Sequence, residues 1–176
     1  MLASIFIYYL VVRIPEYQKR RRLRANLATT YLSFKEDSIA IYLGCIMGSY
    51  PSGLPHRLSD QVEFRSFFKE QHTPDQDRWQ AVANGLNDDR LKALLIELEI
   101  LAQEIHFTLS ATDVQDQRTF QFLKRLTHII HRGKNWTTDY DDVKSLMGFL
   151  WSLHTGWSWI DGYPNSDPVV EVIDSI

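Results

Sequence analysis

Residues 88–111 read DDRLKALLIELEILAQEIHFTLSA. Leucine and isoleucine recur there at spacings of three and four, at Leu91, Leu94, Leu95, Leu98, Leu101, Ile105 and Leu109. Charged and amide side chains fill most of the positions between them. Apolar residues at this spacing lie on one face of an α-helix. The stretch therefore predicts a long amphipathic helix, which we place at the centre of the folded body.

Weaker versions of the same pattern predict helices on both sides of this stretch. Capping residues and apolar spacing place them at about 16–47, 60–71, 116–132, 138–157 and 166–176, and a short segment at 75–85 carries Trp79, Val82 and Ala83. The run GSYPSGLP at 48–55 predicts a loop, and GYPN at 162–165 a turn. No segment alternates apolar and polar residues over a useful length, so we expect no strands. The predicted fold class is all-α, a helical bundle of about four to five helices behind a long N-terminal membrane-proximal helix.

The formal net charge of −3 hides a local concentration of positive charge. Six of the 19 Lys and Arg residues lie between positions 13 and 24, where Glu16 is the only acid. A basic segment on an acidic body favours an anionic surface at one end and argues against a domain that wraps nucleic acid.

The single cysteine, Cys45, excludes an intrachain disulfide, and we expect it to be a small buried hydrophobe.

Residues 1–12, MLASIFIYYLVV, carry no charged side chain and directly precede this basic segment. An uncharged stretch followed by Arg and Lys is typical of a chain at the inner face of a membrane. Twelve helical residues rise about 18 Å, whereas a hydrocarbon core is about 30 Å thick. Three interpretations follow: the inner part of a transmembrane helix, a helix in the interfacial plane, or a core helix of a soluble protein.

On the first two interpretations, the membrane-proximal residues are Tyr8, Tyr9, Arg13, Lys19, Arg20, Arg21, Arg22 and Arg24. The tyrosines would lie at the interface and the cations at the lipid headgroups. A cleaved signal peptide is not expected, because the charge follows the apolar run. The expected division is a membrane-proximal anchor at 1–24, a linking helix at 25–50 and a cytoplasmic helical bundle at 56–176, with the loop at 48–55 as a hinge.

Aromatic side chains gather near the C-terminus, at Phe149, Trp151, Trp157, Trp159 and Tyr163. They do not all share one helical stripe, so some must be buried against another element or another chain. Core packing is one interpretation. The other is an interaction surface formed by Trp151, Trp157, Trp159 and Tyr163 for a protein partner or a second copy.

Patterns typical of catalysis or cofactor binding are missing from the sequence. It has no glycine-rich phosphate loop, no G-x-S-x-G motif and no cysteine pair for zinc. His128 and His131 share a helical face and could hold a metal with His106 or His154, but no carboxylate stands at a fixed offset from them. We therefore expect no metal and no cofactor.

Arg125 and His131 are separated by five residues on the predicted helix at 116–132. This spacing resembles the R-x4-6-H motif of the HEPN ribonuclease superfamily, which is helical and carries its motif on a late helix. The resemblance covers these two positions, and Leu126 stands where the family usually has a polar residue. It implies metal-independent RNA cleavage across a dimer, with Arg125 stabilising phosphate charge and His131 acting as acid or base.

Together these features predict a membrane-associated, non-enzymatic adaptor, regulatory or assembly protein with its bulk in the cytoplasm. The expected partners are lipid headgroups and a protein partner or second copy, and nucleic acid is not expected. One alternative is the HEPN-like ribonuclease using Arg125 and His131. The other is a membrane-tethered sensor of a small anionic ligand, in which the N-terminal helix transmits the change.

Overall fold

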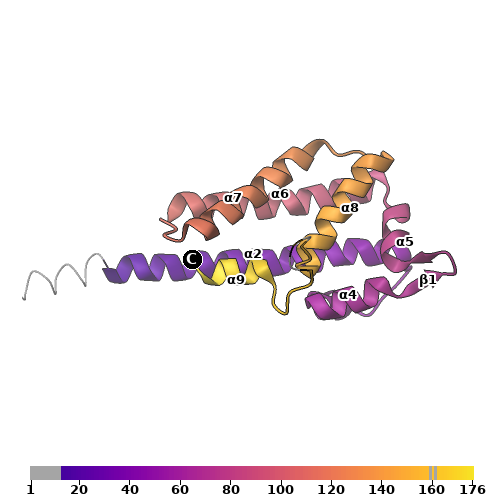
Figure 1. Ribbon diagram of the computed structural model, residues 1–176, viewed down its shortest axis with the longest axis horizontal. Helices are drawn as coiled ribbons and strands as arrows, with labels where there is room; N and C mark the ends of the chain where they lie inside the picture. The colour runs from indigo at the N-terminus through magenta and orange to yellow at the C-terminus, as the bar shows by residue number, and fades with distance from the viewer. Residues whose placement is uncertain (1–12, 159, 161) are drawn as a thin grey trace, which may run out of the picture.

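Residues 13–158, 160 and 162–176 are described by the computed structural model of the chain, and they are mostly helical (Figure 1). The helices are α2 (Ile14–Ile46), α3 (Leu54–Leu58), α4 (Gln61–Lys69), α5 (Arg78–Gly85), α6 (Asp88–Ala111), α7 (Gln117–Arg132), the 3-10 turn η2 (Gly133–Asn135), α8 (Tyr140–Thr155) and α9 (Pro168–Asp174). Strands β1 (Gln71–Thr73) and β2 (Gln76–Asp77) form a short antiparallel hairpin. The all-α class is confirmed, while this hairpin was too short to leave a sequence pattern.

Several helix starts follow the expected capping chemistry. The Asp60 carboxylate accepts hydrogen bonds from the backbone amides of Val62 and Glu63 at the start of α4. The side chain of Asn87 accepts one from the Arg90 amide at the start of α6. These bonds satisfy amides that have no partner inside the helix, which is why polar residues mark the helix starts in the sequence. Helix α6 spans the same residues that the leucine spacing predicted.

Helix α2 contributes more to the fold than a linking helix would. It begins at Ile14 with Pro15 in its first turn, where a missing backbone donor is tolerated. Its later turns are buried in the common core and pack against α6, α5 and α9. The fully or almost fully buried side chains are Leu27, Tyr31, Phe34, Ile39, Tyr42 and Leu43. The segment predicted as a linking helix therefore shares one core with the later helices, and the loop at 47–53 connects α2 to α3.

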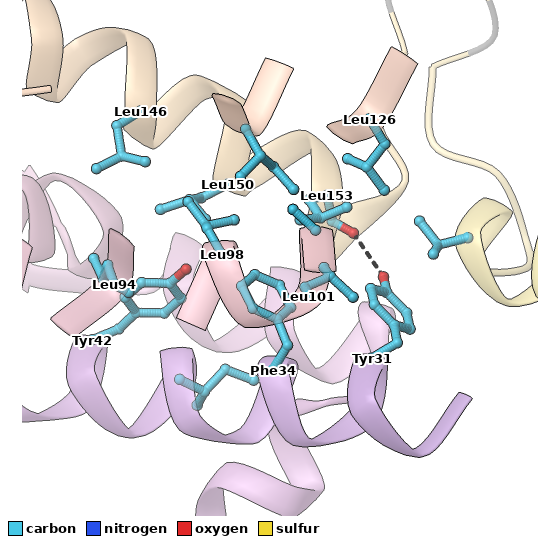
Figure 2. Packing of buried hydrophobic residues seen from close by; sticks show 14 of the residues in the cluster. Tyr31, Phe34, Tyr42, Leu94, Leu98, Leu101, Leu126, Leu146, Leu150 and Leu153 are labelled. Carbon is cyan, nitrogen blue, oxygen red and sulfur yellow. Dashed lines mark hydrogen bonds between the residues drawn. The ribbon is translucent and has the colours of Figure 1, made fainter. Parts of the chain in front are cut away.

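The core lies between α2, α6 and α8. Figure 2 shows the aromatic rings of Tyr31, Phe34 and Tyr42 on α2 facing leucines of the other two helices. Those leucines include Leu94, Leu98 and Leu101 from α6 and Leu146, Leu150 and Leu153 from α8. Cys45 is half-buried at the edge of this core, and burial raises the pKa of its thiol. The aromatic face of α2 thus packs against the leucine stripe of α6.

Replacing Leu98 by Ala tests the central position of α6. The side chain is 1% exposed, so its truncation leaves a cavity that should cost about 2–5 kcal/mol of the free energy of unfolding. The matched control is Ile96→Ala on the same helix, where the side chain is 50% exposed and the expected loss is well below that. Urea unfolding measures both, and similar small losses would contradict the placement of the core.

Candidate functional site

The basic segment lies at the free N-terminal end of α2. Residues 13–19 are exposed, and Leu23 is the first buried side chain of the helix. In Figure 1 this end of α2 extends beyond the rest of the body. Of the predicted membrane-proximal cations, Arg13 directly precedes α2, and Lys19, Arg20, Arg21, Arg22 and Arg24 belong to its first third, whereas Tyr8 and Tyr9 lie outside the described residues. The segment is therefore presented to the surroundings on a rigid helix.

The charges of this segment are not neutralised within the described part of the chain. No ion pair joins any of its cations to a described carboxylate. Arg24 contacts the body, since its guanidinium donates to the carbonyl oxygen of Asp174 at 3.2 Å. Successive side chains rotate by about 100° along a helix, so these cations surround α2. Such a cluster attracts an anionic surface from any side.

Among the described residues, no helix combines the length and apolar character needed to cross a bilayer.

Two members of the predicted aromatic surface make contacts within the chain. Trp151 is half-buried, with its ring centroid 5.3 Å from that of Trp79 and 5.8 Å from that of Phe64. Its indole N–H donates to the hydroxyl of Tyr163 at 3.3 Å. The guanidinium carbon of Arg65 lies 4.4 Å from the centre of the Tyr163 ring, in cation–π contact. Part of the surface of Trp151 and of Tyr163 is therefore covered by contacts within the chain.

Trp157 follows the C-terminal end of α8 and lines an apolar hollow. The hollow has a volume of about 380 Å³ between α7, α8 and the C-terminal loop. Phe122, Leu126, Ile129 and Phe149 contribute to its walls. Trp159 lies outside the described residues. The aromatic region thus contains both a filled core and an open apolar surface, and a partner surface formed by these residues stays a prediction.

A buried ion pair ties the C-terminal end of the chain to α2. The ammonium of Lys35 lies 2.9 Å from Oδ2 of Asp167, with both side chains largely buried. The Tyr31 hydroxyl lies 3.1 Å from the same oxygen and 3.2 Å from the carbonyl oxygen of Leu153, so it can donate to either. Burial, followed by the neighbouring carboxylate, raises the pKa of Tyr31 well above its ordinary value. Asp167 also caps α9, so one carboxylate joins α2 to α9.

A second buried polar cluster surrounds His154 near the end of α8. The imidazole stacks on Phe64 with ring centroids 4.6 Å apart and planes 5° from parallel. Its Nε2 lies 3.2 Å from the hydroxyl oxygens of both Ser38 and Tyr42. Burial, and secondarily the charge of Lys35, holds the pKa of His154 well below its ordinary value. A neutral histidine in a protein core is a suitable hydrogen-bond partner but a poor site for solvent chemistry.

Arg125 and His131 are exposed on α7 and line one hollow between α6 and α7. Nδ1 of His131 lies 3.7 Å from a carboxylate oxygen of Glu99 on α6. The ribonuclease resemblance requires Arg125 and His131 to be exposed, and they are. It also requires them to meet their copies in a second chain, which stays a prediction. Among the described residues, no group of three or more His, Cys, Asp or Glu side chains is placed to hold a metal ion.

Comparison of the chain with protein-family models, curated proteins and solved structures finds no match.

The two buried polar clusters were missed in the sequence, although a signal for them was present. Tyr31, Lys35, Ser38 and Tyr42 recur at spacings of three and four, on the same face of α2 as Phe34. Polar residues on an otherwise apolar helical face are expected to be paired, because burying them unpaired is costly. The partners, Asp167 and His154, are more than a hundred residues away in sequence, so only the fold reveals them.

Lys35→Met tests the buried ion pair. It leaves the Asp167 carboxylate largely buried without its counter-ion, which should cost about 3–5 kcal/mol of the free energy of unfolding. Adding Asp167→Asn removes the stranded charge while keeping a good capping residue, so the double variant should regain much of the loss. Lys92→Met, at an exposed position, is the control. A small loss in Lys35→Met, or no recovery in the double variant, would show that the pair does not stabilise the fold.

The buried imidazole predicts a dependence of stability on pH. The native state keeps His154 neutral, while the unfolded chain binds a proton below the ordinary histidine pKa of about 6.5. The free energy of unfolding should therefore fall between about pH 6.5 and pH 5, with this group contributing up to about 1.4 kcal/mol per pH unit.

Urea unfolding at several pH values measures this slope. In His154→Gln the slope should be smaller, whatever the stability at neutral pH. His72→Gln replaces an exposed histidine and should keep the parent slope. Equal slopes in the parent and His154→Gln would contradict the assignment.

Proposed function

We propose that this protein is a membrane-associated, non-enzymatic adaptor, regulatory or assembly protein, held at the inner face of a cell membrane with its helical body in the cytoplasm. The observation that carries the proposal is the cluster of mostly exposed cations at the N-terminal end of α2, none of them paired with a described carboxylate, directly after the uncharged sequence 1–12. Each Lys or Arg near an anionic leaflet contributes about 1 kcal/mol of attraction. A cluster of this size supplies a lipid-binding surface together with the apolar residues before it.

The continuity of α2 supports the same proposal. The helix that carries the basic segment continues without interruption into the core residues Leu27 to Leu43. Its 33 residues correspond to about 50 Å of helix. A body attached through such a helix is held at a fixed distance from the lipid surface. It would present the same faces to its partners each time, as suits an adaptor or assembly protein.

The adaptor role is inferred from exposed apolar side chains and from the missing catalytic motifs. Ile96, Ile100 and Phe107 lie along one exposed side of α6, each about half exposed. The Trp157 hollow offers a second apolar surface. Exposed apolar side chains that are close to one another favour contact with another protein. A protein partner or a second copy is therefore part of the proposal, alongside the lipid headgroups.

Vesicle binding tests the membrane part. The full chain is mixed with phosphatidylcholine vesicles that contain or lack phosphatidylserine, and the bound fraction is measured by co-sedimentation. The triple variant Arg20→Gln, Arg21→Gln and Arg22→Gln removes three charges, so its affinity for the anionic vesicles should fall by about two orders of magnitude. The parent chain should also bind more weakly as the salt concentration rises.

The matched control removes three charges from the body, in Arg57→Gln, Lys92→Gln and Lys144→Gln. All three side chains are exposed and lie outside the basic segment, so vesicle binding should be unchanged. Fractionation of cells that express the full chain provides a second measurement. Recovery in the soluble fraction without detergent, at low and high salt alike, would contradict the membrane role.

A further inference from the structure

Helix α7 carries a second concentration of positive charge, which the overall charge balance conceals. Residues 117–132 read QRTFQFLKRLTHIIHR and include Arg118, Lys124, Arg125 and Arg132 without a single Asp or Glu. The body around this helix is acidic in balance, since most of the 22 acidic residues lie outside residues 13–24 and outside α7. Opposite charges were therefore available in the chain to neutralise α7, and the fold places few of them beside it.

Two of these cations, Lys124 and Arg125, meet imidazoles in one hollow of about 610 Å³ between α6 and α7. We call this hollow the basic groove and define it by its titratable lining residues, His106, Lys124, Arg125, His128 and His131. No Asp or Glu belongs to the described lining. The carboxylate of Glu99 on α6 lies 3.7 Å from Nδ1 of His131, at one end of the groove. The opposite end has an apolar wall that includes Leu109 and Phe120.

Two cations of the groove keep their hydrogen-bonding capacity for a ligand. Within the described residues, neither Lys124 nor Arg125 forms an ion pair. The ammonium of Lys124 lies 5.9 Å from the centre of the Phe120 ring, a contact that leaves its donors unused. Lys124 and Arg125 lie four and three residues before His128, so each is a neighbour of His128 on the surface of α7, and all three line the groove. Their N–H groups can therefore converge on one anion.

The chemistry of these donors selects a phosphate group. A guanidinium presents a planar fork that matches two phosphate oxygens, and an ammonium adds a point charge beside it. The volume of the groove lies within the range of about 300–1,000 Å³ that small-molecule sites occupy. The two cations of the groove are neighbours on one helix, so they can contact few of the many phosphates through which a long nucleic acid binds. These features favour a compact anion over a polymer.

We propose that the basic groove binds a small organic phosphate of about nucleotide size. Arg125 and Lys124 hold the phosphate oxygens, with His128 as a further donor, and the wall formed by Leu109 and Phe120 contacts the apolar part of the ligand. The site is separate from the basic segment of α2, so this proposal does not depend on membrane binding.

Isothermal titration of the full chain in detergent micelles tests the groove, with inorganic pyrophosphate and ADP as probes. Both should bind, and ADP should bind more tightly because pyrophosphate cannot use the apolar wall. Lys124→Gln and Arg125→Gln should each weaken ADP binding by about tenfold or more, and Arg125→Lys should lose less than Arg125→Gln. The control Lys92→Gln with Lys144→Gln removes two exposed charges elsewhere and should leave binding unchanged.

Each other outcome contradicts the proposal. These outcomes are no binding of either probe by the parent chain, or equal binding by the parent and the variant Lys124→Gln with Arg125→Gln. Tighter binding or cleavage of single-stranded RNA, lost in that double variant, would replace the small ligand by a nucleic acid. Loss of binding to phosphatidylserine vesicles in the same variant would make the groove a lipid site. Thermal unfolding of the double variant should match that of the parent, since both side chains are exposed.

Discussion

The burial of one face of α2 against α6 and α8 is the interaction on which the rest of the structure depends. This face brings Tyr31, Phe34 and Tyr42 to the leucines of the other helices, as Figure 2 shows. The same helix has exposed residues on every side before Leu23. A single helix therefore serves two environments, and the body cannot change its orientation relative to the basic segment without bending α2. Attachment of the basic segment to a membrane, as proposed, would therefore also set the orientation of the body relative to that membrane.

Buried polar groups add specificity to this apolar packing. The pair Lys35–Asp167 fixes the position of the C-terminal segment, because an ion pair in a core tolerates little change in geometry. His154 does the same for the end of α8 through Ser38 and Tyr42. Gly156 then ends α8 with a φ of +66°, and an added Cβ would lie 2.8 Å from Pro168. The apolar contacts supply most of the burial, while these groups select one arrangement of the C-terminal elements around α2.

The sequence predicted the parts of the fold that depend on local patterns. The leucine spacing located α6, and polar residues at 59–60 and 87–88 marked the starts of α4 and α6. The central role of α2 was missed, because Lys35, Ser38 and two tyrosine hydroxyls interrupt its apolar face. Lys35 and the tyrosine hydroxyls pair with residues far away in sequence, and Ser38 also donates to the carbonyl oxygen of Phe34. The basic groove was missed because the net charge of the whole chain is negative. The positive charge of α7 becomes visible only when the charged residues of each helix are counted separately. Arg125 and His131 were singled out from their spacing, whereas their proximity to His106 on α6 required the contact between α6 and α7.

Hydrogen–deuterium exchange of the full chain, measured with and without phosphatidylserine vesicles, tests the central claim most directly. The claim is that lipid binds the exposed basic end of α2 while the body stays unchanged. It predicts slower exchange of the amides in residues 13–24 when vesicles are present, with no change in the buried turns of α2 or in α6. Unchanged exchange in residues 13–24, or slower exchange confined to other parts of the body, would contradict it.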